Sequence, residues 1–445
     1  MMGYMVYFNV VRSKEIINSP YNVRLDSMAD RVVRGDILDK NGNVLAETEV
    51  YEDGTEKRVY PYGDLFAHVV GYDSHGKSGL ESTENFNLLT SHAFFGERLL
   101  NEFQEEKNIG DNVVTTLDVN LQKAAYDALG NYKGAVIVTE VTTGKILAML
   151  SKPDFDPNTL VADWDELINS EGSALLNRAT QGAYAPGSVF KLVTTLAYMQ
   201  QNNNYDNYSY ECTGSIVEGD TTIHCAKKRV HGTENLMESL ANSCNASYSN
   251  IGLNLNMKSY QETAKKLLFN SELPCELAYS QSKFSLSEDA TSSEVMMTAI
   301  GQGQTLVSPY HMALISSAIA NGGTLMKPYF VDRIENYTGS VVEKNMPEKY
   351  TSLMTSQEAA QLKEYMRAVV TSGTASSLNS DRYTVAGKTG TAEYSSDKEK
   401  AHSWFTGFTN VDNPELAISV VVESADNSGM SAVSVAKKVL NAYYN

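Results

Sequence analysis

The chain reads Tyr184-Ala-Pro-Gly-Ser-Val-Phe-Lys191 directly before an apolar run that extends to Met199. A proline and a glycine interrupt the chain here, and the apolar residues after them have helical spacing, so the pattern predicts a helix that begins at Ser188. Side chains three positions apart share a helix face, which brings the Lys191 amine within reach of the Ser188 hydroxyl. By itself the pattern is more typical of an ordinary helix start, because Ser-x-x-Lys should occur about twice by chance in a chain of this length.

Two further polar motifs follow along the chain, Ser243-Cys-Asn245 and Lys388-Thr-Gly-Thr391. The first should also occur about twice by chance and, taken alone, is typical of a polar loop. The second is expected only roughly 0.01 times in such a chain. Its ordinary interpretation is a polar edge strand with a glycine for close approach. The order of the three motifs and their context favour a common site.

These residue types in this arrangement indicate nucleophilic acyl transfer. The free backbone N–H groups of a helix start favour negative charge at Ser188. A hydroxyl nucleophile also needs a base. Lys191 can serve as that base only if its pKa is lowered, and both burial and the nearby cation of Lys388 can lower it.

The segment that carries the third motif offers a binding surface for a peptide. Gly390 lets a substrate backbone lie alongside as an added strand. The Lys388 amine and the hydroxyls of Thr389 and Thr391 can hold a carboxylate. The backbone amide of Thr391 can also form an oxyanion hole together with the amide of Ser188.

With the three motifs in order, the sequence resembles the class B penicillin-binding proteins over nearly its whole length. Further segments that match the usual wording of this family are Asn177-Arg-Ala179, His231-Gly-Thr233, Leu240-Ala-Asn-Ser-Cys-Asn245, Gly301-Gln-Gly303, Ser372-Gly-Thr374, Trp404-Phe-Thr-Gly407 and, near the front, Arg34-Gly-Asp36 with Asp39 and Gly79-Leu-Glu81. The resemblance implies an α+β fold. It consists of a serine β-lactamase/transpeptidase-like domain, with an antiparallel sheet and an all-helical subdomain, preceded by a small irregular α+β pedestal module.

The resemblance also implies an activity, a peptidoglycan D,D-transpeptidase that forms an acyl-enzyme on D-Ala-D-Ala termini and is acylated and inhibited by β-lactams. The acceptor is an amine of a neighbouring stem peptide, and no cofactor or metal is expected. The roles implied are Ser188 as nucleophile, Lys191 as its base, Ser243 as proton relay assisted by Lys388, Asn245 as a hydrogen-bonding partner of the substrate amide, and Thr389, Gly390 and Thr391 as the substrate-binding strand.

Other functions compete with this one. A carboxypeptidase uses the same residues with water as acceptor, and the motifs do not separate the two. A class A β-lactamase is disfavoured, because no Glu-x-x-Leu-Asn pattern follows Asn245 to position a deacylating water. A catalytically idle cell-wall scaffold is disfavoured because all three motifs are intact. Intact motifs do not argue against a β-lactam sensor, but a sensor is expected to carry a signalling segment across the membrane, and the sequence shows none.

The length of the chain and the pattern of apolar and polar residues along it indicate how its domains are organised. A chain of 445 residues is longer than one core usually holds, so we expect two domains. Residues 12–115 are predicted to form the non-catalytic dimerisation or pedestal module, with a hairpin at Asn41-Gly42. This module is too short for the glycosyltransferase domain of class A relatives. Residues 116–445 are predicted to form the transpeptidase domain.

Within the second domain, apolar strands are expected near both ends, with helical segments between them. A segment of this kind suggests one sheet assembled from its two extremes. The elements expected are a helix at Val119–Leu129, strands at Gly134–Val141, Lys145–Leu150, Thr384–Ala386, Ser403–Phe408 and Leu416–Glu423, and a closing helix at Ser431–Tyr444.

Charge and the N-terminus bear on location and partners. The net charge of −18 repels phosphate backbones, so nucleic acid is not expected as a partner. Residues 1–11 are apolar but about half the length that spans a bilayer. With the family resemblance, they are interpreted as the stub of an N-terminal membrane anchor. The protein is then expected on the outer face of the cytoplasmic membrane, where its partners are stem peptides, the lipid-linked precursor and a polytopic glycosyltransferase.

Four cysteines are too few for a disulfide scaffold. Cys212 and Cys225 share a Thr/Gly-rich segment and are expected to lie within about 7 Å of one another at their Cα atoms. Free thiols or a disulfide are favoured over zinc. The spacing of Cys212 and Cys225 is loose for a zinc ribbon, and His224 directly adjoins Cys225, so that both rarely bind one ion.

Overall fold

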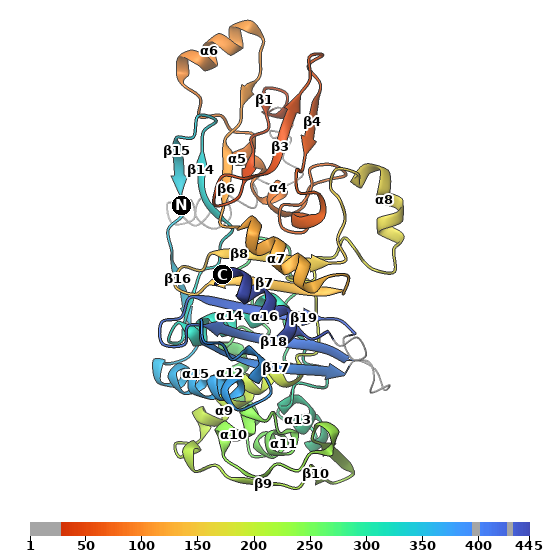
Figure 1. Ribbon diagram of the computed structural model, residues 1–445, viewed down its shortest axis with the longest axis vertical. Coiled ribbons are helices and arrows are strands. Elements are labelled where there is room, and N and C mark those ends of the chain that lie inside the picture. The colour runs from red at the N-terminus through yellow and green to blue at the C-terminus, as the bar shows by residue number, and fades with distance from the viewer. Residues whose placement is uncertain (1–27, 394–400, 425–429) are drawn as a thin grey trace.

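A computed structural model describes residues 28–393, 401–424 and 430–445 of the chain. The expected anchor stub, residues 1–11, lies outside the described residues. The molecule is elongated, with the N-terminal module at one end and the helical elements of residues 187–300 at the other (Figure 1). Within the described ranges, no helix has the length and apolar character needed to cross a membrane.

The centre of the molecule is an antiparallel five-stranded sheet in the order β17-β18-β19-β7-β8. Its strands are β7 (Gly134–Glu140), β8 (Ile146–Lys152), β17 (Val385–Glu393), β18 (Ala401–Thr409) and β19 (Leu416–Val422). The predicted hairpin forms between β7 and β8, and β19 pairs with β7 across nearly 300 residues of sequence, from Leu416 opposite Glu140 to Val422 opposite Gly134. The prediction of one sheet built from both ends of the domain is therefore confirmed.

Helices cover both faces of this sheet. On one face α7 (Val119–Leu129) packs against α16 (Ala432–Tyr443), and on the other lies α14 (Pro309–Ala320), all of whose residues are buried. The predicted bounds of α7 are confirmed. Its start is fixed by Asp118, whose carboxylate accepts hydrogen bonds from two backbone amides of the first turn.

The remaining helices of the second domain form the subdomain at the lower end of Figure 1 or join it to the sheet. They are η3 (Gly187–Phe190), α9 (Lys191–Gln201), η4 (Tyr205–Asn207), η5 (Ala226–Lys228), α10 (Leu236–Ala241), α11 (Asn245–Leu253), α12 (Met257–Lys266), α13 (Ser292–Ala299), α15 (Ser356–Thr371) and η6 (Ser376–Leu378), with α8 (Leu160–Asn169) at the side of the molecule. Short two-stranded sheets accompany them, formed by β9 (Tyr210–Cys212) with β12 (Gly232–Glu234), β10 (Ser215–Glu218) with β11 (Thr221–His224), and β13 (Thr324–Met326) with β16 (Lys349–Ser352).

A six-stranded sheet forms the N-terminal module, in the order β15-β14-β6-β2-β3-β4. Its strands are β2 (Ile37–Leu38), β3 (Val44–Val50), β4 (Glu56–Val59), β6 (Asn112–Thr115), β14 (Val331–Glu335) and β15 (Val341–Lys344). The predicted hairpin at Asn41-Gly42 is confirmed, with Ile37 opposite Ala46. Two of the six strands come from beyond residue 330, so the sheet takes strands from both sides of the boundary that the sequence predicts near residue 115.

Smaller elements complete the module. They are β1 (Val32–Val33) paired with β5 (Asn108–Ile109), η2 (Gly63–Phe66), α4 (Gly79–Thr83), α5 (Asn85–Leu88) and α6 (Phe95–Gln104), which projects at the end of the molecule (Figure 1).

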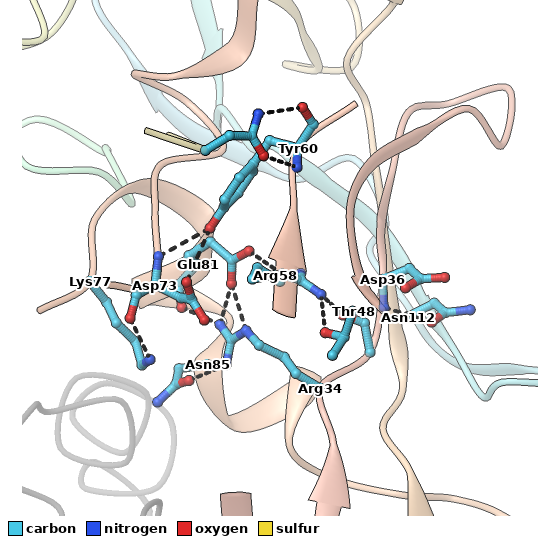
Figure 2. A network of polar contacts seen from close by, with 12 residues as sticks. Arg34, Asp36, Thr48, Arg58, Tyr60, Asp73, Lys77, Glu81, Asn85 and Asn112 are labelled. Carbon is cyan, nitrogen blue, oxygen red and sulfur yellow. Dashed lines mark hydrogen bonds and ion pairs between the residues drawn. The ribbon is translucent and has the colours of Figure 1, made fainter. Parts of the chain in front are cut away.

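A buried ionic network ties these elements together (Figure 2). Glu81 is fully buried on α4 and accepts hydrogen bonds from Arg34 at 2.6 Å and from Arg58, on β4, at 2.7 Å. Arg58 also donates to the backbone carbonyl of Gly35 at 2.8 Å. One carboxylate thus provides the counter-charge for two buried guanidinium groups from different segments of the module, as buried charges require.

Candidate active site

The first motif lies where a short helix meets the central sheet. Gly187 begins η3 with φ of +55°, and a Cβ at this position would lie 2.4 Å from the carbonyl oxygen of Thr391 on β17. Its amide donates to the carbonyl of Gly301 at 2.8 Å. Only glycine combines this backbone conformation with so close an approach. Ser188, the next residue, is half-buried, and η3 continues directly into α9 at Lys191.

Lys191 is fully buried and binds the second motif. Its Nζ atom donates to the carbonyl of Ser243 at 2.8 Å, to Oδ1 of Asn245 at 2.7 Å and to the hydroxyl of Ser243 at 3.2 Å. Burial lowers the pKa of Lys191 to about 7. A lysine in this state loses its proton near neutral pH, which is the property that a general base needs.

Lys388 approaches the same hydroxyl from β17. It is also fully buried, and its Nζ atom donates to the Ser243 hydroxyl at 3.0 Å and to the carbonyl of Thr389 at 3.0 Å. Burial, and then the nearby charge of Lys191, hold the pKa of Lys388 well below its usual range. The Ser243 hydroxyl therefore hydrogen-bonds to two amines, and the surroundings of each amine favour its neutral form.

The second motif is held in an uncommon conformation. Ser243 has φ of +57°, a left-handed backbone that a serine adopts only when its surroundings fix it. Asn245 begins α11, and its side-chain amide donates to the carbonyl of His224 at 3.0 Å. The side chain of Asn245 thus connects Lys191 to the last residue of β11.

The third motif lies in the middle of β17, at the edge of the sheet. Thr389 shares a hydrogen bond of 2.7 Å with the hydroxyl of Thr374, and the side chain of Thr391 is exposed. A Cβ at Gly390 would lie 3.0 Å from Cβ of Trp404 and 3.1 Å from the carbonyl of Pro186. The glycine therefore lets β17 lie against both the neighbouring strand and the segment before Ser188.

The three motifs predicted from the sequence thus converge, although 145 residues separate Ser243 from Lys388. Two further residues complete the surroundings of the site. The sequence indicates Thr374 only as part of a segment that matches the family, and nothing in the sequence indicates Tyr248, whose ring centroid lies 5.2 Å from Nζ of Lys191. A tyrosine inside a helical run is indistinguishable from an ordinary core residue.

Comparison with known families agrees with this geometry. Residues 134–443 match the penicillin binding protein transpeptidase domain, and residues 34–113 match the penicillin binding protein A dimerisation domain. The chain belongs to the class B penicillin-binding proteins. This penicillin-binding protein has the α+β transpeptidase fold with an N-terminal module that the sequence predicts.

Individual relatives are similar over almost their full length. The penicillin-binding protein is 31% identical over 436 residues to the peptidoglycan D,D-transpeptidase PbpA of Mycolicibacterium smegmatis, a match that covers 90% of this chain and 87% of that protein. A structure of penicillin-binding protein A from Mycobacterium tuberculosis, a ceftriaxone acyl-enzyme complex, has 28% identity and a TM-score of 0.86, with 95% of this chain and 100% of that chain covered. The D,D-transpeptidase domain of a peptidoglycan glycosyltransferase from Eggerthella lenta has 29% identity and a TM-score of 0.82, with 93% and 98% covered.

Proposed function

We propose that the chain is a serine D,D-transpeptidase that cross-links peptidoglycan stem peptides through an acyl-enzyme on Ser188. The observation that carries the proposal is the convergence of two buried lysines, Lys191 and Lys388, on the hydroxyl of Ser243. Lys191 lies three residues after Ser188, where η3 continues into α9. The similarity to PbpA of M. smegmatis, itself named a peptidoglycan D,D-transpeptidase, supports the same activity.

In the first half-reaction the oxygen of Ser188 attacks the carbonyl of the penultimate D-alanine. The Ser188–carbonyl ester bond forms, the peptide bond to the terminal D-alanine breaks, and that D-alanine leaves with a proton on its nitrogen. Lys191, with a pKa of about 7, accepts the proton of Ser188. Ser243, which binds both lysines, passes a proton to the leaving amine.

In the second half-reaction an amine of a neighbouring stem peptide attacks the ester. The new peptide bond forms, the ester breaks, and Ser188 recovers its proton from the attacking amine through the same groups. The amides of Ser188 and Thr391 stabilise the oxyanion in both steps. In other acyl-transfer enzymes one such donor contributes about 3–4 kcal/mol.

The substrate lies along β17 as an added strand. Thr389 and Thr391 engage its terminal carboxylate beside Lys388, and Gly390 leaves room for its backbone. The side chain of Asn245, held by Lys191 and the carbonyl of His224, hydrogen-bonds the substrate amide. The hydrogen bond between the hydroxyls of Thr374 and Thr389 holds the Thr389 side chain in place.

Incubation with a penicillin followed by intact mass spectrometry tests the proposal. The β-lactam carbonyl occupies the place of the scissile carbonyl, so one adduct should form, on the peptide that contains Ser188. The opened ring stays attached and blocks the path of an acceptor, so the adduct should persist for minutes or longer. Ser188→Ala should abolish it. An adduct on another peptide contradicts the nucleophile assignment, and return of unmodified protein within seconds favours a β-lactamase.

The proposal extends to location and partner. The protein acts on the outer face of the cytoplasmic membrane, on stem peptides of the lipid-linked precursor, beside a polytopic glycosyltransferase. Support comes from α6, which exposes Phe94, Phe95, Leu99, Leu100 and Phe103 at the free end of the module. An apolar surface of this kind marks an interaction site. Phe103→Glu should reduce co-purification with the glycosyltransferase, whereas Val161→Glu on α8, which is also exposed, should not; equal recovery of both contradicts this contact.

A further inference from the structure

Four metal-binding side chains meet beside the second motif. They are Cys212, Cys225, His231 and Cys244, and their donor atoms all lie within 4.8 Å of one another. The sulfur of Cys225 is 3.6 Å from that of Cys212 and 3.7 Å from that of Cys244, and Nδ1 of His231 is 3.4 Å from the sulfur of Cys212. All three cysteines are buried free thiols.

The three distances of 3.4, 3.6 and 3.7 Å are close to those between ligand atoms of a tetrahedral zinc site. Zinc binds sulfur at about 2.3 Å and imidazole nitrogen at about 2.0–2.1 Å, so tetrahedral angles put two sulfurs about 3.8 Å apart and a sulfur and a nitrogen about 3.5 Å apart. A disulfide accounts for the cluster less well, because three mutually adjacent thiols cannot all pair and a histidine is left beside them. We propose that these four residues bind one zinc ion.

The fold supplies the four ligands from four separate segments. Cys212 ends β9, Cys225 follows β11, His231 precedes β12 and Cys244 caps α11. Backbone amides of Gly214 and Ser247 approach the sulfurs of Cys212 and Cys244 at 3.4 Å. Amide donors of this kind orient and stabilise thiolate ligands. Because the protein provides all four ligands, the site is closed and structural, with no open position for catalysis.

The sequence spacing favoured thiols or a disulfide over zinc, since spacing does not show how loops fold together. The adjacency of His224 and Cys225 argued against both binding one ion, and the structure avoids that conflict. The fourth ligand position is occupied by His231, on the far side of η5, and Cys244 joins from the second motif.

The zinc site bears directly on the residues that hold Lys191. Cys244 lies between Ser243 and Asn245, both of which accept hydrogen bonds from Lys191. Cys225 adjoins His224, whose carbonyl accepts the hydrogen bond from Asn245. One ion therefore fixes the second motif and the loop that contacts it, and stabilises the left-handed backbone of Ser243. The ligands are positioning residues, and this role rests on the acyl transfer proposed above, whereas the binding of zinc does not.

Metal analysis tests the binding. Protein purified under reducing conditions with zinc present should hold one zinc per chain by elemental analysis and native mass spectrometry. Cobalt exchanged into the site should give sulfur-to-metal charge-transfer bands and the strong visible bands of a tetrahedral ion. Cys212→Ser should lose the metal, whereas Cys275→Ser, a change at the cysteine outside the cluster, should keep it. Substoichiometric metal with three titratable thiols, or a disulfide among them, overturns the proposal.

Acylation kinetics test the positioning role separately. Removal of zinc by a chelator should lower the maximal acylation rate constant of a fluorescent penicillin by about 10–100-fold, the usual effect of losing support around a site. The noncovalent affinity should change little, because the carboxylate-binding residues lie on β17, and added zinc should restore the rate. Circular dichroism verifies that the metal-free protein is folded. If it unfolds, the acylation rate constants of the Cys212→Ser variant and of the cobalt-substituted protein are compared with that of the zinc-loaded protein instead.

An unchanged acylation rate in folded, metal-free protein contradicts the positioning role while leaving the zinc site in place. Absence of any adduct on Ser188 in the zinc-loaded protein instead contradicts the proposed transpeptidase. The two failures are therefore distinguishable.

Discussion

Lys191 and Lys388 are both buried, and within the described residues their hydrogen-bonding partners are carbonyl, amide and hydroxyl oxygens, with no carboxylate among them. Two ammonium groups in such surroundings destabilise one another, so each favours the neutral form of the other. Burial is the main reason that the pKa of Lys191 falls to about 7, and the thiols of Cys244 and Cys225 and the carboxylate of Glu234 oppose that fall.

Acylation should therefore depend on pH through Lys191. A base must be neutral, so the rate constant for acylation by a fluorescent penicillin should rise about tenfold per pH unit below pH 7 and level off above about pH 8. Lys191→Ala should slow acylation by about 10²–10⁴-fold and abolish the rise. The pH profile measured by stopped-flow fluorescence tests this expectation, and a rate that is constant between pH 5 and pH 8 contradicts it.

The sequence predicts the reactive residues better than their arrangement. Ser188 and Lys191 are three positions apart at a helix start, so their common face follows from helix geometry alone. The meeting of Ser243 with Lys388 depends on how β17 lies against the helical subdomain, which no local pattern contains. Likewise, the left-handed conformation of Ser243 and the contact from Thr374 arise from tertiary structure.

At the scale of elements, the site depends on how closely η3 approaches β17. Gly187→Ala should place a methyl group 2.4 Å from the carbonyl of Thr391, which forces the two elements apart and displaces the amides of the oxyanion hole. Acylation should fall by about 10²-fold or more. Gly219→Ala is the matched control, because Gly219 has the same φ of +55° with open space around it.

Both variants carry a similar backbone penalty, about 1–3 kcal/mol. Comparison of their acylation rates therefore isolates the contact with Thr391 from the strain. Equal rates in the two variants contradict the view that the distance between η3 and β17 controls the reaction.

Long elements with a clear period were predictable, and short ones were not. The helix at Val119–Leu129 and the five strands of the central sheet have many apolar residues at regular spacing. The strands β9 to β12 have three or four residues each, too few for a period. Three of the four proposed zinc ligands lie at their ends, because Cys212 ends β9, Cys225 follows β11 and His231 precedes β12. The strands β14 and β15 lie within a polar segment and pair with one another, and β14 also pairs with β6, which precedes it by more than 200 residues.

At the scale of the whole molecule, the buried network around Glu81 contributes to the stability of the protein but contains none of the residues with a proposed chemical role. Burial alone would raise the pKa of Glu81, but the charges of Arg34 and Arg58 hold it at about 2. Relative to an ordinary glutamate, this shift corresponds to about 3 kcal/mol of stability. The folded-state pKa is depressed, so this stability is present above about pH 4.5 and is lost as the pH falls toward 2.

Glu81→Ala removes the carboxylate that pairs with two buried guanidinium groups and should destabilise the protein by about 3–5 kcal/mol. Glu348→Ala, which removes an exposed pair with Lys327 at 3.9 Å, should cost less than about 1 kcal/mol. Urea unfolding monitored by circular dichroism compares the two. Similar unfolding midpoints for the two variants contradict the structural role of the network.

The module and the chemistry should also be separable by truncation, because every residue with a proposed chemical role lies beyond residue 177. A chain that begins at Asp111 keeps β6 beside β14 and β15 but loses β2, β3 and β4, which exposes an edge of β6 to solvent. It should be acylated at Ser188 within about threefold of the full-length rate, since a difference of that size is about 0.6 kcal/mol. It should also aggregate more readily, because an unpaired strand edge promotes association. Fluorescent penicillin labelling of the monomeric fraction from size-exclusion chromatography makes the measurement. Folded but unreactive monomer contradicts the prediction, and means that the module shapes the site through the strands it shares with the second domain.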